Sequence, residues 1–238
     1  MSVFDGLFGY EKAMLVLGVL LFLLLAALLI VQASRGKPFA AMLPAFALPI
    51  VMIGYPSVKK ITIGKDSITL EKTTHALLAA PTNSAVRTSL ATQVAGLAHR
   101  PTADPAVLTN IAAAQFALGH STQAQATLAK AVDAAPALPA AVQLQQRIDF
   151  DKALATLTAR LAHHPDDATR KELSAVLAQT APLKISSPIF LDHIASAHAV
   201  LGERAKAQIF AGQALRIDPN LPDAIQMKAL AAGPGMQP

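Results

Sequence analysis

The sequence predicts a mainly α-helical membrane protein: an N-terminal transmembrane helical hairpin, a short β-hairpin, and then an α-solenoid of helix pairs. Three observations predict this order. An uncharged apolar run lies near the N-terminus, an alternating apolar and polar segment follows it, and prolines and glycines then divide the chain into pieces of helical length. The predicted parts are a membrane anchor at 1–56, a β-hairpin collar at 57–73, a helical repeat domain at 74–231 and a disordered tail at 232–238.

The composition excludes several classes of protein. Hydrophobic residues make up 53% of the 238 residues, and cysteine is absent, so there can be no disulfide scaffold, thiolate zinc site or cysteine nucleophile. The net charge is +5, but most of the excess lies beside the apolar N-terminal segments, where Lys and Arg set membrane topology. With no Trp and two Tyr, the chain offers few rings for base stacking. Nucleic acid is therefore not an expected partner.

The first predicted span is the run from Ala13 to Val31, which carries no charge. As a helix it would be roughly 28 Å long, close to the thickness of the hydrocarbon core of a bilayer. A cleaved signal peptide is the alternative, because Val31-Gln32-Ala33 has small residues that suit a signal peptidase, but the apolar run is longer than usual for such a peptide. A retained transmembrane helix is the favoured interpretation.

The second predicted span covers residues 39–55 and is short for crossing a bilayer. It contains Pro44 and Pro49, which membrane helices tolerate when neighbouring groups satisfy the freed carbonyls. An interfacial or re-entrant segment is the alternative. The cations around the two segments favour a cytoplasmic repeat domain in a bacterial-type inner membrane protein. Those on the inner side would be Lys12, Lys59, Lys60 and Lys65, against Arg35 and Lys37 between the spans.

The segment from Ser57 to Lys72 predicts a β-hairpin. Apolar residues alternate with polar ones around Ile61 and Ile63 and again around Ile68 and Leu70, and residues 64–67 (GKDS) supply turn chemistry. We expect a structural collar at the membrane exit, with a binding edge for another strand as the less favoured alternative.

From His75 onward the strand signals stop and short helical segments follow one another, punctuated by Pro, Gly, Asp and Ser. Short connections between helices favour antiparallel pairs stacked as an array. The predicted helices are 84–99, 105–118, 122–134, 138–148, 150–163, 167–179, 188–201, 204–216 and 221–231.

Two stretches of this part repeat one another. LGERAKAQIFAGQALRIDPN (201–220) aligns without a gap on LGHSTQAQATLAKAVDAAPA (118–137), and the match extends upstream to Pro188 and Pro105. The spacing resembles the tetratricopeptide repeat, a helix–turn–helix unit of about 34 residues. The resemblance covers 105–138 and 188–221 and weakens between them, so the central units are expected to be irregular.

Small and special residues in both copies fit a helix–turn–helix unit. Ala112 and Ala195 would let the two helices of a pair approach closely. Gly119 and Gly202 suit the left-handed position that ends a helix. The second helix of each pair should stop before its proline, Pro136 or Pro219.

The histidines do not form a convincing chemical site. His163 and His164 precede Pro165, and structural roles explain these residues without a metal: histidines suit a helix C-terminus, while Asp166 or Asp167 would cap the next helix. His193 and His198 are five residues apart, not the four that a two-histidine zinc face requires. No catalytic motif occurs, so we expect no enzyme, metal or cofactor.

The resemblance implies that the first helix of each pair lines a groove for a peptide or helix of a protein partner. A membrane-anchored adaptor is the expected function, with the lipid bilayer and a protein as partners. Alternatives are a structural subunit or assembly factor of a membrane complex, with a periplasmic repeat domain as in some cytochrome c maturation proteins, and, last, an enzyme. Mapped by repeat position, the groove residues are Thr109, Asn110, Phe116, Gln143, Arg147, Asp192, His193 and Ser196.

Overall fold

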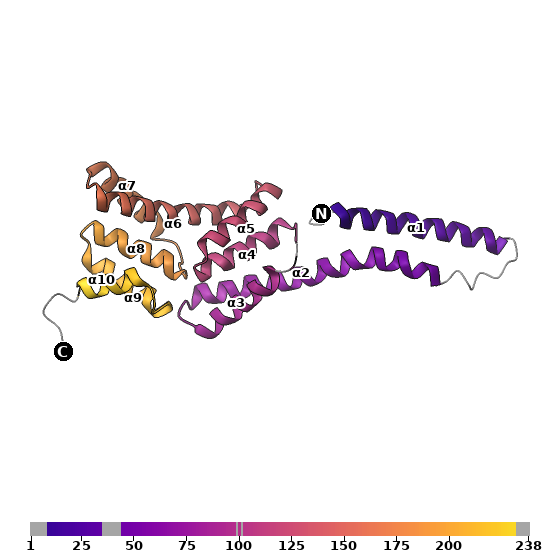
Figure 1. Ribbon diagram of the computed structural model, residues 1–238, viewed down its shortest axis with the longest axis horizontal. Helices are drawn as coiled ribbons and strands as arrows, with labels where there is room; N and C mark the ends of the chain where they lie inside the picture. Colours follow the sequence, from indigo (N-terminus) through magenta and orange to yellow (C-terminus); the bar gives the residue numbers. More distant parts are fainter. Residues whose placement is uncertain (1–8, 35–43, 99, 101, 232–238) are drawn as a thin grey trace.

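The computed structural model describes residues 9–34, 44–98, 100 and 102–231. These residues form ten α-helices and a short 3₁₀ turn at 44–46, and they contain no strand, so the mainly α class is confirmed (Figure 1). The predicted tail at 232–238 lies outside the described residues. The helices are α1 Gly9–Ser34, α2 Ala47–Ala79, α3 Ser84–Ala98, α4 Pro105–Leu118, α5 Ser121–Ala134, α6 Pro139–His163, α7 Asp167–Thr180, α8 Pro188–Val200, α9 Arg204–Ile217 and α10 Pro222–Ala231.

Helix α1 is long and apolar enough to cross a membrane. Its stretch Gly9–Gln32 has 24 residues, and an 18-residue window within it has a mean hydropathy of 3.3 with only 6% of that window buried within the protein. A core helix of a soluble protein would be covered instead. Most large exposed apolar side chains of the described chain lie on α1 and the start of α2, including Leu20, Leu23, Leu24, Ile30, Leu48 and Val51.

Helix α1 packs along the N-terminal part of α2 (Figure 1). Gly18 permits this approach, because a Cβ added there would lie 3.0 Å from both Met52 Cβ and Ile53 Cγ1. One turn further along α1, the rings of Phe22 and Phe46 meet edge to face with centroids 5.4 Å apart. Residues 39–43 of the predicted second span lie outside the described residues, and Pro44–Tyr55 is a shorter apolar stretch than that of α1.

The predicted β-hairpin at 57–73 is wrong: α2 runs without interruption from Ala47 to Ala79. The helix therefore crosses both predicted domain boundaries, at 56/57 and at 73/74. Apolar residues at 63, 70 and 77 recur every seven positions, and the small polar residues Ser67 and Thr74 complete the same buried stripe. The steps of four and three residues along this stripe average 3.5, which is the period of a helix. The alternation of apolar and polar residues that suggests strands holds only over a few residues within it.

Tertiary burial explains why β-branched residues and a glycine stay helical here. Ile63, Leu70 and Leu77 are buried in one cluster with apolar residues of α3 and α4, including Leu90 and Ile111. A glycine inside a helix costs only about 1 kcal/mol, which the burial of several large side chains exceeds. The threonine hydroxyls are satisfied within the helix; for example, Thr69 Oγ1 donates to the Lys65 carbonyl over 3.0 Å.

Helices α2–α10 pack mainly on their neighbours along the chain. Each even-numbered helix contacts the next even-numbered one, from α2 on α4 to α8 on α10. Each odd-numbered helix from α3 to α9 contacts the even-numbered helices before and after it. The even-numbered helices therefore share one surface, which we call the first-helix face because each opens a pair.

Local details that were predicted for residues 105–138 and 188–221 are confirmed. Gly119 and Gly202 have φ of 95° and 84°, and they are the residues with positive φ among those described. Ala112 and Ala195 are fully buried. The helix α5 ends two residues before Pro136, and α9 ends two residues before Pro219.

Two predicted helices, 138–148 and 150–163, are one helix in the structure. Helix α6 continues through Asp149, whose side chain accepts a hydrogen bond from Gln145 Nε2 over 2.8 Å on the exposed face. An aspartate in mid-helix is only mildly unfavourable, and neither Pro nor Gly stands between the two halves. The next helix begins as expected, since Asp166 accepts from the Thr169 amide over 2.7 Å.

Substitutions of Leu70 and of Ile68 distinguish a helix from a β-hairpin at residues 57–73. Leu70 is fully buried and Ile68 is 54% exposed, whereas a hairpin would place both on one face. We expect Leu70→Ala to lower the free energy of unfolding by about 2–5 kcal/mol and Ile68→Ala to change it by less than about 0.5 kcal/mol. Chemical unfolding of the full chain in detergent measures both, and equal losses would contradict a helical α2.

Candidate functional site

The groove residues predicted on α4 are turned inward or engaged. Thr109 is buried, and its hydroxyl donates to the Pro105 carbonyl of its own helix over 2.7 Å. Asn110 Nδ2 donates to Ser67 Oγ of α2 over 3.1 Å. Phe116 is in the core, its ring 5.8 Å from that of Phe190 on α8. These three side chains hold the array together and offer little to a partner.

The middle of the first-helix face is covered by the connection between α7 and α8. Residues 183–187 lie against side chains of α2, α4, α6 and α8, and leave a cavity of only about 30 Å³ between them. Ser186 and Ser187 are buried, and Arg87 Nη2 of α3 donates to the Ser186 carbonyl over 2.9 Å. Residues 183–187 therefore occupy the place where the open groove was expected.

The two predicted residues on α6 lie differently with respect to this connection. Arg147 is partly buried and lines the small cavity beside residues 183–187. Gln143, one turn earlier, is exposed. Gln143 thus remains accessible on the first-helix face, and Arg147 is mostly covered.

On α8, the predicted His193 meets a residue of α6 that the sequence analysis did not predict, Asp151. His193 Nδ1 lies 2.6 Å from Oδ1 of Asp151 on α6, and the other oxygen of Asp151 accepts from Ser121 Oγ over 3.0 Å. Asp192 is buried, while Ser196 is partly buried. Asp151, Asp192, His193 and Asp223 of α10 form what we call the acidic cluster.

The pKa values of both Asp192 and His193 in the acidic cluster are raised. Burial, followed by the charge of Asp223, raises the pKa of Asp192 to about 6, although His193 opposes the shift. Burial lowers the pKa of His193, but the hydrogen bond to Asp151 and the charges of Asp151, Asp192 and Asp223 together raise it above its usual value. Protons therefore bind this cluster more readily than they bind isolated side chains.

The geometry of the acidic cluster does not suit nucleophilic catalysis. Ser121 lies beside the cluster, but Asp151 stands between Ser121 and His193 and contacts both. A serine nucleophile needs the histidine beside its hydroxyl to take the proton, with the carboxylate behind the histidine. The arrangement fixes the side chains of α5, α6 and α8 relative to one another.

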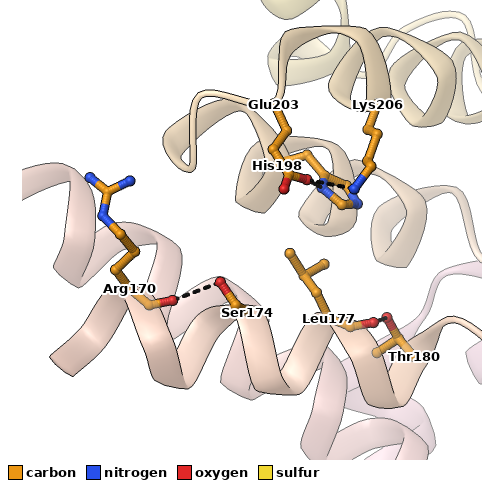
Figure 2. Close-up of polar contacts among 7 residues, drawn as sticks. All are labelled: Arg170, Ser174, Leu177, Thr180, His198, Glu203 and Lys206. Atoms are coloured by element: carbon orange, nitrogen blue, oxygen red, sulfur yellow. Dashed lines mark hydrogen bonds and ion pairs between the residues drawn. The ribbon is translucent and has the colours of Figure 1, made fainter. Parts of the chain in front are cut away.

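A larger cavity opens between α7 and the α8–α9 pair, with a volume of about 400 Å³. Helix α7 packs closely on α6 but barely touches α8, which leaves this side of α7 uncovered. Figure 2 shows His198, Glu203 and Lys206 facing Ser174 and Leu177 of α7 across the opening. Small residues make room for the cavity: Ser174 and Ala178 on α7 and Ala181 directly after it.

The polar groups around this cavity are already engaged with one another. Glu203 Oε2 lies 2.7 Å from His198 Nδ1 and 3.1 Å from Lys206 Nζ. The His198 ring also stacks on Phe210 with centroids 5.4 Å apart. Ser174 and Thr180 donate their hydroxyl protons to carbonyls of their own helix, as the dashed lines in Figure 2 mark. The cavity is thus mainly apolar and suits an uncharged apolar group.

Sequence reasoning missed two members of the acidic cluster, Asp151 and Asp223. Asp151 is distant in the chain from His193 and belongs to a helix that was divided in two, so no repeat position pointed to it. Its signal is its place in α6: Asp151 lies three positions from both Ile148 and Leu154, on the stripe that is buried. Polar residues on an apolar stripe mark a buried partner.

No protein-family model, curated protein or solved structure matches the chain.

Replacing Asp192 by the neutral, isosteric asparagine should stabilise the protein at neutral pH. The raised pKa means that folding costs up to about 3 kcal/mol when Asp192 is ionised, and that the cost disappears as the pH falls through about 6 towards 4. We expect Asp192→Asn to raise the free energy of unfolding by about 1–3 kcal/mol at pH 7.5 and by much less at pH 4.5. The exposed Asp133→Asn is the control.

Thermal and chemical unfolding at both pH values measure the difference between wild type and variant. His193 contributes stability in the same direction, because its raised pKa favours the folded state below about pH 6.5. Its contribution is largely shared by wild type and variant and cancels in the comparison. A loss of stability in Asp192→Asn at pH 7.5 would contradict the burial of an uncompensated charge.

Proposed function

We propose that the protein is a membrane-anchored adaptor, in which a tetratricopeptide-like helical array binds a protein partner close to the bilayer. Helix α1 and the apolar start of α2 form the anchor as a helical hairpin, and α2–α10 form the array. The function is recruitment: anchoring raises the effective concentration of the bound partner at the membrane.

The observation that carries this proposal is the continuity of α2. The apolar residues at its start pack on α1, and Ile63, Leu70 and Leu77 further along the same helix lie in the core of the array. A helix of this kind has no flexible linker in it, so the array is held at a fixed height and orientation. A scaffold that presents a partner to the membrane benefits from such a rigid connection.

The packing of α2–α10 supports a binding role for the first-helix face. Arrays in which each unit touches only its neighbours are extended, and they bind partners over the surface that one helix of each pair supplies. Residues 183–187 cover the middle of this face, so the accessible positions lie to either side. They are Gln143 on α6 and, near α10, the exposed Asp223 and partly exposed His193 of the acidic cluster.

The array belongs on the cytoplasmic side in this proposal, because the cations that flank the apolar segments favour that orientation. A reporter fused after the C-terminus tests the side: green fluorescence without alkaline phosphatase activity is expected. Phosphatase activity would overturn the cytoplasmic placement and favour a subunit or assembly factor that works in the periplasm.

Site-specific photo-crosslinking in native membranes tests the adaptor function. A photoreactive residue at Gln143 or at His193 should capture the same protein, because both positions lie on the first-helix face. The matched control positions are Lys130 on α5 and Gln213 on α9, which are exposed on second helices. Equal capture from all four positions, or none from Gln143 and His193, would contradict binding on this face.

A further inference from the structure

The exposed face of α2 changes from apolar to polar within about one turn. Residues at spacings of three or four lie on one side of a helix, and Tyr55, Val58, Thr62 and Lys65 follow this spacing. Tyr55 and Val58 are 57% and 64% exposed, and Thr62 and Lys65 beyond them are also exposed. Further along, Ile68 is a single exposed apolar residue among polar neighbours. The continuous apolar surface of α2 therefore ends at about Val58.

The exposed surface of α1 changes in the same way near its N-terminal end. Tyr10 and Lys12 are exposed there, and from Val16 onward the large exposed side chains of the helix are apolar. Tyr10 and Tyr55 are the two tyrosines of the whole chain. Tyrosine is enriched where a protein passes from hydrocarbon to water, because its ring is apolar and its hydroxyl is polar. Each helix thus has its tyrosine beside the change.

The two changes lie at the same level of the hairpin. Helices α1 and α2 run antiparallel, and Gly18 lies against Met52 and Ile53 (Figure 1). Lys12 comes six residues before Gly18 in the sequence, which is about 9 Å along the helix axis. Val58 lies about the same distance beyond Met52 and Ile53 on α2. One plane across the hairpin therefore separates the apolar surface of both helices from the polar surface.

Positive charge dominates on α1 and α2 next to this plane. Four lysines lie at its level or within about two turns beyond it: Lys12, Lys59, Lys60 and Lys65. Of the two acidic residues there, Asp66 is paired with Arg100, and Glu11 is only 2% exposed. Lys12 and Lys65 are exposed, and within the described residues neither ammonium takes part in an ion pair. Their charge is therefore available to a partner outside the chain.

We propose that these lysines bind anionic phospholipid headgroups in the leaflet next to the array, with Lys12 and Lys65 as accessible contacts. The inference rests on the membrane anchor of the proposed function and adds the chemistry of the lipid that the anchor meets. The plane through Lys12 and Val58 is then the edge of the hydrocarbon core, and Tyr10 and Tyr55 lie at this edge. A headgroup layer is about 5–8 Å thick, and the long side chain of a lysine can bend back to reach it.

This position of the bilayer places the array directly on the headgroups. Ile63, the first core residue of α2, lies only about 8 Å beyond the level of Val58. The lysines therefore meet the negative surface potential of an anionic leaflet, which is short-ranged and screened by salt. Anionic lipid should gather around the hairpin at low ionic strength and disperse at high ionic strength.

The chain has no tryptophan, so a single introduced one reports the lipid around it. Val58→Trp lies at the proposed edge, and the exposed Thr69→Trp lies about 16 Å further along α2. The full chain is reconstituted in phosphatidylcholine bilayers, in which lipids with brominated acyl chains quench tryptophan. We expect quenching of the Val58→Trp reporter and little quenching of the Thr69→Trp reporter. Equal quenching of both would overturn the position of the plane.

Lipid preference is measured with brominated phosphatidylglycerol against brominated phosphatidylcholine at the Val58→Trp reporter. We expect the anionic lipid to bind about fivefold more strongly at about 0.05 M salt, and nearly equally at about 1 M salt. Equal quenching by the two lipids at low salt would overturn the proposal, as would a preference that salt does not change.

Substitutions assign the preference to the lysines. Lys12→Gln combined with Lys65→Gln should lower it to about twofold or less, whereas arginine at both positions should keep it. Lys72→Gln is the matched control, because Lys72 is an exposed lysine of the same helix about 21 Å beyond Val58. Quenching by brominated phosphatidylcholine shows that each variant is still inserted. An unchanged preference in the double glutamine variant, or an equal loss in Lys72→Gln, would contradict the assignment.

The outcome is separable from that of the adaptor proposal, because the bilayers contain no partner protein. Quenching without a preference for the anionic lipid would remove the lipid site and leave the anchor and the adaptor standing. A Val58→Trp reporter that neither lipid quenches would overturn the anchor together with the lipid site. A lipid preference without any protein crosslinked through Gln143 or His193 would support the lipid site and contradict the adaptor.

Discussion

The burial of one stripe of α2 against α3 and α4 is the interaction on which the rest of the structure depends. Ile63, Leu70 and Leu77 share a core with the first two helices of the array, and the apolar start of the same helix packs on α1 through the close approach at Gly18. Without this stripe α1 and the helices from α3 onward would be joined by a flexible segment. With it, every later helix pair stacks from a surface that is fixed relative to α1.

The array then separates residues that hold it together from residues that remain available. Residues 183–187 cover the middle of the first-helix face, and Phe116 and Phe190 meet beneath them. The acidic cluster at the C-terminal end keeps an unpaired carboxylate that lowers the stability of the fold.

Much of the array could be predicted from the sequence because its signals are local. Prolines and glycines mark the helix ends, and the left-handed Gly119 and Gly202 follow from the need for positive φ at the end of a helix. The cap at Asp166 is equally local. These features depend on a few adjacent residues, so tertiary packing does not alter them.

The rest could not be predicted because packing decides it. The segment around Ile63 and Ile68 satisfies a strand pattern locally. The helical spacing becomes visible only when Leu77, which lies beyond the predicted hairpin, is included. The contact between Asp151 and His193 joins distant parts of the chain, and the path of residues 183–187 follows the surface that they cover. The punctuation of the sequence therefore placed α4, α5, α8 and α9 close to their observed bounds, but it could not say that residues 183–187 would cover the face that the even-numbered helices share.

The most direct test of the central claim is the distance across the middle of α2. The chain has no native cysteine, so spin labels at Val58→Cys and Lys72→Cys, both exposed, report it without interference. At 1.5 Å per residue a continuous helix separates the two backbone positions by about 21 Å. The account predicts a single narrow distribution near that value in detergent and in liposomes. A short distance of about 5 Å, as between paired strands, or a broad distribution would contradict it.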